Sequence, residues 1–315
     1  MEADFKEGEY SYALSKLTED LKAEVVHAAT DFEDVQIYTG EVHRPGLQLA
    51  GFFDYFMPSR IQVIGRMESA YMLKLSDEER LARWNALFSR KVTALIVCQG
   101  AVITQELVKA AHEHNVTVLS AKENATEVMA SVISIMKVEV APRITRHGVL
   151  VEVYGMGLFI VGDSGVGKSE TAIELLKRGH RLIADDAVEI KAIDTDVVQG
   201  SAPALIKHYV ELRGIGVIDV RQIFGVGAVR GFQKIHLVVN LEPWDDKALY
   251  DRLGINENTV NILGVEVAAI TIPVTPGRNL AVILEVAAMN QRQKYMGYNA
   301  AQEFIKQIDN YFDEM

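Results

Sequence analysis

An eight-residue segment in the second half of the chain has the composition and spacing of a phosphate-binding loop. Residues 162–169 follow the pattern G-x-x-x-x-G-K-S. Glycines allow backbone N–H groups to converge on phosphate oxygens without Cβ clashes. A lysine at the seventh position can reach the outer phosphates of a nucleotide, and a serine at the eighth can bind Mg²⁺. The pattern predicts a nucleotide-phosphate site made of Gly162, Asp163, Ser164, Gly165, Val166, Gly167, Lys168 and Ser169.

Two adjacent aspartates follow soon after this loop. The apolar run Leu182–Ala184 ends at Asp185 and Asp186. A carboxylate at the end of such a strand is typical of the acidic residue held beside the metal in P-loop proteins. Two carboxylates also allow a division of labour, in which one organises Mg²⁺ and the other accepts a proton from an attacking hydroxyl.

The elements around the loop are those that the motif requires. Leu158–Val161 is a short apolar run typical of a strand, and residues 169–178 carry the apolar stripe of a helix that Gly179 ends. The positive end of that helix would point at the phosphates. We expect another strand over Val149–Tyr154, with a turn over residues 155–157.

A third segment, Glu211–Val220, combines charge with two glycines. Glu211 offers a hard oxygen ligand that could complete a magnesium shell. Gly214 and Gly216 are compatible either with close approach to a ligand or with an ordinary turn between strands.

The pattern of motifs narrows the class of P-loop protein. A regulatory GTPase needs an Asn-Lys-x-Asp segment for base recognition, and the chain contains none; a mechanical ATPase usually has a longer gap before its acidic strand. A compact phosphotransferase remains.

The first half of the chain has an alternating pattern of strands and helices. Strands are expected over 36–38, 61–64, 92–98 and 116–119, and helices over 76–90, 104–115 and 127–136, with Ser76 and Glu79 forming a capping box. This order implies a parallel sheet. We expect an N-terminal α/β domain over 1–137, in which 1–10 form an acidic tail, and a second domain over 138–315 that ends in helices 280–295 and 300–311.

Composition excludes several classes of protein. Of 315 residues 49% are hydrophobic and 24% charged, as in ordinary globular domains. The net charge of −11 gives little electrostatic support for binding nucleic acid. The sole cysteine, Cys98, can form neither an internal disulfide nor a cysteine-based zinc cluster. The first 22 residues lack the basic start and apolar core of a signal peptide, and the longest apolar runs are strand-sized. We expect a cytoplasmic protein with no nucleic-acid or membrane partner.

Taken together, these motifs resemble those of the HPr kinase/phosphorylase family, and the resemblance covers nearly the whole chain. In the second half it rests on the phosphate loop, on residues 183–186, on the segment Glu211–Val220 and on residues 273–278. In the first half, residues 44–47 and 60–65 are similar to the N-terminal domain of the family. The first ten residues depart from the family pattern.

The resemblance implies an architecture and a set of residue roles. The N-terminal α/β domain would precede a P-loop kinase domain similar to phosphoenolpyruvate carboxykinase, in a homohexamer. Asp186 matches the catalytic acid/base, His147, Lys168 and Arg252 match other catalytic positions, and Ser169 and Glu211 match magnesium ligands. The loop associated with dephosphorylation matches Pro273, Val274, Thr275, Pro276, Gly277 and Arg278.

The activity implied by the resemblance has two directions. ATP and Mg²⁺ would support phosphorylation of a serine of the phosphocarrier protein HPr. Inorganic phosphate would drive the reverse reaction, the phosphorolysis of phosphoserine-HPr, and yield pyrophosphate. Both reactions would regulate carbon metabolism through catabolite repression. A P-loop small-molecule kinase is the alternative, and a nucleotide-responsive binding module is a third possibility.

Overall fold

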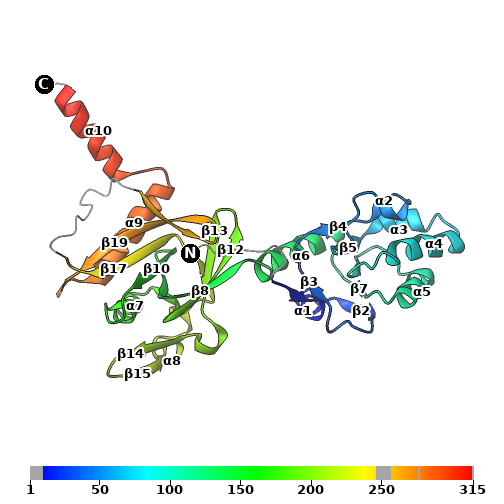
Figure 1. Ribbon diagram of the computed structural model, residues 1–315, viewed down its shortest axis with the longest axis horizontal. Coiled ribbons are helices and arrows are strands. Elements are labelled where there is room, and N and C mark those ends of the chain that lie inside the picture. Colours follow the sequence, from blue (N-terminus) through cyan, green and yellow to red (C-terminus); the bar gives the residue numbers. More distant parts are fainter. Residues whose placement is uncertain (1–9, 246–256, 276, 314–315) are drawn as a thin grey trace. The chain divides into compact units, whose positions relative to one another are not determined.

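The computed structural model describes residues 10–245, 257–275 and 277–313. The chain divides into two compact units between Pro142 and Arg143, and both combine helices with sheets (Figure 1). The α/β fold class predicted from the sequence is therefore confirmed. Among the described residues, no helix is both long and apolar enough to cross a membrane.

The N-terminal unit is built on a five-stranded sheet in the order β2-β7-β6-β5-β4. Strands β4 to β7 are parallel and β2 is antiparallel to its neighbour, so the parallel sheet predicted from the alternating pattern is confirmed. A separate antiparallel pair joins β1 and β3. The strands are β1 Tyr12–Ala13, β2 Glu24–His27, β3 Gln36–Ile37, β4 Val42–His43, β5 Ile61–Ile64, β6 Leu95–Val97 and β7 Val118–Ser120.

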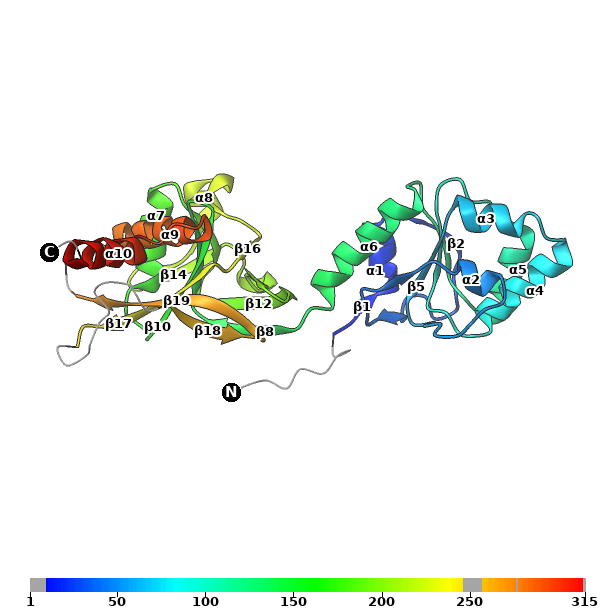
Figure 2. The ribbon, with the colours of Figure 1, turned by 90° about the horizontal axis from the view of Figure 1, so that it is seen from above.

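Helices cover both faces of this sheet, because alternate apolar residues of its central strands point to opposite sides (Figure 2). Val63 packs with α1 and α6, whereas Ile64 packs with the other four helices. The capping box predicted for α4 is confirmed, since the Ser76 hydroxyl accepts a hydrogen bond from the backbone N–H of Glu79. The helices are α1 Leu14–Asp20, α2 Gly46–Leu49, α3 Arg66–Met72, α4 Asp77–Phe88, α5 Gln105–His114 and α6 Ala125–Glu139.

The C-terminal unit contains a six-stranded mixed sheet in the order β11-β9-β10-β17-β19-β18. Strands β10, β17 and β19 are parallel, and the other neighbours are antiparallel. The turn expected over 155–157 is shorter than predicted, because Tyr154 and Gly155 both adopt positive φ and reverse the chain in two residues. The strands are β9 Val149–Val153, β10 Met156–Gly162, β11 Arg181–Ala184, β17 Leu237–Pro243, β18 Asn258–Ile262 and β19 Val265–Val274.

Two layers cover this sheet. Helices α7 (Lys168–Lys177) and α9 (Leu280–Tyr295) pack on one face, around the apolar side chains of β9, β10 and β17. An antiparallel sheet in the order β16-β13-β12-β8 packs on the other face. Its strands are β8 Arg143–His147, β12 Ala187–Asp194, β13 Val197–Ser201 and β16 Phe232–Lys234.

A two-stranded hairpin stands apart from both sheets. Strands β14 (Tyr209–Leu212) and β15 (Gly216–Asp219) pair only with each other, and α8 (Val220–Phe224) follows directly. Val210 is buried in the core beside α7, which anchors the hairpin. The remaining elements are the 3₁₀ turns η1 Ala204–Ile206 and η2 Val226–Ala228, and the terminal helix α10 Ala300–Asp313.

Candidate active site

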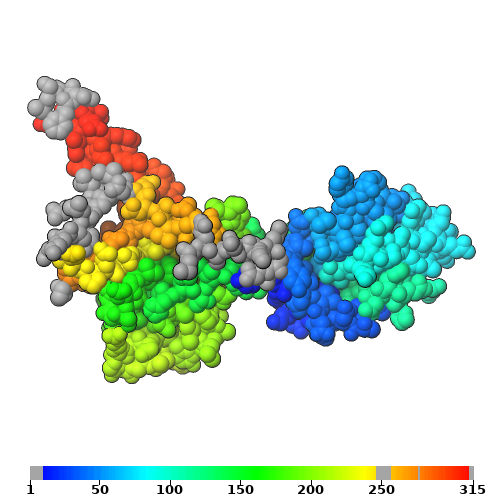
Figure 3. All heavy atoms as spheres, viewed as in Figure 1, coloured from blue at the N-terminus to red at the C-terminus, as the bar shows by residue number. Residues whose placement is uncertain are grey.

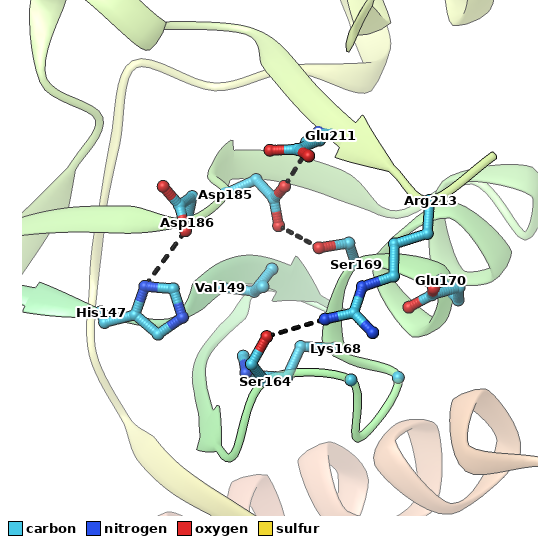
Figure 4. Close-up of a pocket in the computed structure, with 12 residues that line it drawn as sticks. His147, Val149, Ser164, Lys168, Ser169, Glu170, Asp185, Asp186, Glu211 and Arg213 are labelled. Carbon is cyan, nitrogen blue, oxygen red and sulfur yellow. Dashed lines mark hydrogen bonds and ion pairs between the residues drawn. The ribbon is translucent and has the colours of Figure 1, made fainter. Parts of the chain in front are cut away.

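A pocket of about 150 Å³ lies where five elements of the C-terminal unit meet. It is formed by the loop between β10 and α7, the end of β8, the start of β9, the turn between β11 and β12, and the hairpin strand β14 (Figure 4). The side chains drawn around it are His147, Val149, Ser164, Lys168, Ser169, Glu170, Asp185, Asp186, Glu211 and Arg213.

The floor of the pocket is the phosphate loop. Gly162 has a φ of +143°, and a Cβ there would lie only 2.2 Å from the carbonyl oxygen of Leu241, so only glycine fits. Lys168 is buried, and its Nζ donates to the carbonyl oxygens of Gly162 and Asp163 at 2.7 and 2.9 Å. Its ammonium group is therefore held directly over the loop. The N-terminus of α7 adds the positive end of the helix dipole at the same place.

Asp185 connects the phosphate loop to the neighbouring strand end. Its side chain is almost fully buried and accepts hydrogen bonds from the Ser169 hydroxyl at 2.9 Å and from the Glu211 backbone N–H at 3.3 Å. Burial raises the pKa of Asp185, an effect that the two hydrogen bonds oppose and the nearby Asp186 reinforces. The serine of the loop and the first aspartate thus form one polar unit.

Asp186 lies in a different environment from its neighbour. Its side chain is 70% exposed, and its Oδ1 lies 3.1 Å from the Nδ1 of His147, whose side chain is 60% exposed. Strand pairing brings the two together, because Ala187 of β12 pairs with His147 of β8. Asp186 has a φ of +68°, in the left-handed region that aspartate and asparagine tolerate better than most residues. This sharp turn directs two consecutive carboxylates to different places.

The hairpin supplies the side of the pocket opposite His147. Glu211 lies on β14 and Arg213 directly follows the end of that strand, and both residues line the pocket. The Arg213 Nη2 donates to the Ser164 hydroxyl at 3.0 Å, which places a guanidinium beside the phosphate loop. Sequence reasoning did not select Arg213 for the site, although its two-residue spacing from Glu211 was the available signal.

The donor set suits a magnesium ion shared with a nucleotide. Ser169, Asp185 and Glu211 all line the pocket and offer oxygen atoms, which Mg²⁺ prefers. The described residues contain no group of three or more His, Cys, Asp or Glu side chains that could hold a metal ion alone. Magnesium sites in nucleotide-binding proteins usually use one or two carboxylates together with substrate phosphates. Ser169, Asp185 and Glu211 therefore fit the Mg²⁺ that the phosphate-loop motif implies.

Other residues expected at the site lie apart from it or outside the described residues. Pro273 and Val274 end β19, at the same edge of the sheet as the phosphate loop, because β10, β17 and β19 run in parallel. Arg278 is exposed, donates to the carbonyl oxygen of Pro273 at 2.9 Å and does not line the pocket. Arg252 and Pro276 lie outside the described residues.

Comparisons with known proteins cover both units. Residues 138–308 match the family model described as the HPr serine kinase C-terminal domain, and residues 13–136 match the HPr serine kinase N terminus. The HPr kinase/phosphorylase of Caldanaerobacter subterraneus subsp. tengcongensis is 48% identical over 302 residues, which are 95% of this chain and 99% of the relative. That of Lachnoclostridium phytofermentans is 47% identical over 301 residues, 96% of this chain and 97% of the relative. A solved structure of an Hpr(Ser) kinase/phosphatase from Coxiella burnetii is 35% identical and has a TM-score of 0.47, covering 51% of this chain and 98% of that chain.

Proposed function

Because the chain belongs to the HPr serine kinase family, we propose that it transfers the γ-phosphoryl group of ATP to a serine of HPr and also catalyses the reverse phosphorolysis. It is a bifunctional protein-serine kinase and phosphorylase. Through these two reactions it regulates carbon metabolism. The observation that carries the residue assignment is the arrangement of the pocket, with a phosphate loop on one side and the exposed His147–Asp186 pair on the other.

The exposure of that pair also favours a protein acceptor over a small molecule. Kinases of small metabolites enclose their acceptor, since a concave pocket must bury most of a small ligand. Here the proposed acid/base is 70% exposed at the mouth of a small pocket. A protein can cover such a site with its own surface when it presents a serine to it.

In the forward direction, Asp186 accepts the proton of the serine hydroxyl as the oxygen attacks the γ-phosphorus. The His147 Nδ1 lies 3.1 Å from the Asp186 Oδ1, where an Nδ1–H donates to the carboxylate and orients it. The Lys168 ammonium and the amides at the start of α7 bind the phosphates and stabilise negative charge in the transition state. The Arg213 guanidinium lies beside the loop, where it can also contact phosphate oxygens.

The metal would be held by Ser169, Asp185 and Glu211. When bound, Mg²⁺ neutralises charge on the outer phosphates. Asp185 is already fixed by the hydroxyl of Ser169 and the backbone of Glu211, so the oxygen ligands are oriented before the nucleotide enters.

In the reverse direction, an oxygen of inorganic phosphate attacks the phosphorus of phosphoserine. The bond between phosphorus and the serine oxygen breaks, and the new P–O–P bond gives pyrophosphate. Asp186 starts this reaction protonated and donates its proton to the departing serine oxygen, as microscopic reversibility requires. We assign residues 273–278 to this direction; the position of Pro273 and Val274 at the sheet edge that carries the phosphate loop supports the assignment.

The proposal extends to assembly and compartment. A homohexamer is implied by the family, and α10, which exposes Phe304 and Ile308, offers an apolar face for contact between copies. A cytoplasmic location is supported by the single cysteine, Cys98, which is buried and unpaired as expected in a reducing compartment.

A labelling experiment tests the function. The purified chain is incubated with γ-labelled ATP, Mg²⁺ and HPr, and in parallel with HPr whose acceptor serine is replaced by alanine. Label is expected on HPr but not on the alanine variant, and pyrophosphate is expected from phosphoserine-HPr and inorganic phosphate. Label on a metabolite from a mixed pool would instead indicate a small-molecule kinase, and no transfer at all would indicate a binding module.

A further inference from the structure

Two segments of the N-terminal unit that support the family resemblance, residues 44–47 and 60–65, meet at one edge of its sheet. Arg44 directly follows β4, and Gly65 directly follows β5. Because β4 and β5 are parallel neighbours, both residues lie at the carboxyl edge of the sheet. The reaction proposed above assigns no role to either segment.

A buried carboxylate joins the two segments. The side chain of Glu68 is only 5% exposed, and its Oε2 accepts hydrogen bonds from the Arg44 Nη2 at 2.7 Å and from the Gly65 backbone N–H at 2.9 Å. Burial raises the pKa of Glu68, but the hydrogen bonds from Arg44 and Gly65 outweigh this effect and hold the pKa below its ordinary value. Glu68 is therefore ionised at neutral pH, and it fixes the Arg44 side chain at the sheet edge.

The Arg44 guanidinium keeps a donor that no described residue satisfies. Its Nε is buried and has no acceptor, although the side chain as a whole is 33% exposed. Buried N–H groups in folded proteins nearly always have a partner. A guanidinium offers five N–H donors, and one carboxylate does not satisfy them all. Arg44 is thus held in place with donors left for a second oxygen-bearing group.

A second arginine lies at the same edge. Arg66 is exposed and forms no ion pair with the described residues. A Cβ at Gly100 would lie 2.4 Å from the Arg66 Nε, so the guanidinium packs against the backbone just beyond the end of β6. Since β4 and β6 are the two neighbours of β5, Arg44 and Arg66 flank the end of β5. Helices α2 and α3, which begin close after Arg44 and at Arg66, adjoin on the surface of this unit (Figure 3, blue and lighter blue).

The topology of the sheet favours ligand binding at this edge. Helix α5, which follows β6, packs on one face of the sheet, whereas α6, which follows β7, packs on the other. In open α/β sheets, ligands bind outside the carboxyl ends of the strands, where the connections from adjacent strands leave to opposite faces. The Gln99 backbone N–H donates to the carbonyl oxygen of Glu123 at 2.9 Å, which holds the two connections together at this point. Arg66 lies over the β6 connection, beside it.

We propose that the carboxyl edge of the N-terminal sheet binds the oxyanion of a small molecule, a phosphate or a carboxylate group, between Arg44 and Arg66. Arg44 supplies N–H donors that Glu68 holds in position, and Arg66 supplies a positive charge that no described carboxylate pairs with. Guanidinium groups match phosphate and carboxylate oxygens equally well in geometry. Arg44 is two-thirds buried, so the group that reaches it is small. All of these residues belong to the N-terminal unit, whereas the phosphate-loop pocket belongs to the other.

The test measures anion binding by calorimetry in the full chain carrying Lys168→Ala, so that the phosphate loop does not contribute. Inorganic phosphate, glycerol 3-phosphate and succinate are titrated separately. Arg66→Gln removes the exposed charge, and the double variant Arg44→Gln/Glu68→Gln removes both members of the buried pair, so that neither charge is left unpaired. The matched control is Arg90→Gln, which removes an exposed arginine between α4 and β6, at the amino edge of the same sheet.

At least one probe is expected to bind with a Kd of about 1 mM or below, and Arg66→Gln and the double variant should each weaken binding about tenfold, whereas the control should stay within about twofold. Binding of the two phosphates without succinate would assign the site to phosphate groups, and the reverse to carboxylates. The bound probe should also slow hydrogen exchange in peptides that cover residues 44–66 and 98–124.

Three results would overturn the inference. They are no binding of any probe, binding of equal strength in Arg66→Gln and the control, and slowed exchange confined to the C-terminal unit. Circular dichroism checks that the double variant is folded. If it is not, Arg66→Gln alone decides, because its exposed side chain holds no buried partner in place.

Discussion

The Nδ1 of His147 lies 3.1 Å from the Oδ1 of Asp186, and the pairing of β8 with β12 brings these residues together. One residue earlier in the chain, Asp185 is buried and bonded to Ser169. Two consecutive carboxylates therefore occupy different environments, one suited to a metal and the other open to an acceptor. The following predictions test this division.

Asp186→Asn should abolish proton transfer without disturbing the fold. Asparagine tolerates the left-handed backbone at this position, where φ is +68°. Phosphorylation of HPr and phosphorolysis are both expected to fall by about 10²–10⁴, the usual contribution of a positioned acid/base. ATP affinity, measured by calorimetry, should stay near that of the wild type. Near-normal rates in either direction would indicate that the two aspartates have exchanged roles.

Asp185→Asn should weaken magnesium binding and yet stabilise the fold at neutral pH. Burial raises the pKa of Asp185 above its unfolded value, so the stability linked to this group is present at low pH and is lost as pH rises through the folded pKa. Asparagine keeps the acceptor oxygen for Ser169 without the buried charge. Thermal melts in EDTA from pH 4 to pH 8 should show Tm of the wild type falling relative to the variant as pH rises. A relative change in the opposite direction would contradict the raised pKa.

Lys168→Ala should abolish nucleotide binding and both activities. The variant removes the ammonium group that lies over the loop and contacts the carbonyl oxygens of Gly162 and Asp163. The control is Lys177→Ala, which removes the same charge at the other end of α7, where the side chain is exposed. Nucleotide affinity close to that of the wild type in a fluorescence titration would show that the loop is not part of the nucleotide-binding site.

Arg213→Ala should lower kcat for transfer to HPr by about tenfold or more, and Arg213→Lys should recover little of the loss. A guanidinium can bond Ser164 and a phosphate oxygen at once with a fixed geometry, which an ammonium cannot reproduce. Arg181→Ala serves as the control, because Arg181 is a half-exposed arginine that pairs with Glu152. Full rescue by lysine would mean that only the charge matters.

Arg278→Ala should impair phosphorolysis more than phosphorylation. The Arg278 Nη1 donates a hydrogen bond to the carbonyl oxygen of Pro273. When this bond breaks, the guanidinium can offer several donors to inorganic phosphate. The two rates are measured with saturating ATP and with saturating phosphate, and Arg292→Ala on α9 provides a comparison for general effects. Equal losses in both directions would reject a specific role in the reverse reaction.

The local features of the site could be predicted from the sequence, whereas its long-range contacts could not. The strand, loop and helix around residues 162–169 follow from a motif whose geometry is local, and α9 begins and ends at the predicted residues. In contrast, β9 lies between β10 and β11 in the sheet, although β10, α7 and β11 are consecutive in the chain. Hydrophobic periodicity does not encode such an order. The contact of His147 with Asp186 likewise depends on the register of β8 and β12, so only the family resemblance pointed to His147.

The separation of the β14–β15 hairpin from both larger sheets has a consequence for how enzymes of this design can diversify. Its outward side chains contribute to no ladder other than their own, so they can be exchanged without altering the strands that hold the phosphate loop. Exposed positions of the ribbon that do not line the pocket, such as Ile215 and Val217, can therefore change while Glu211 and Arg213 keep their places in it.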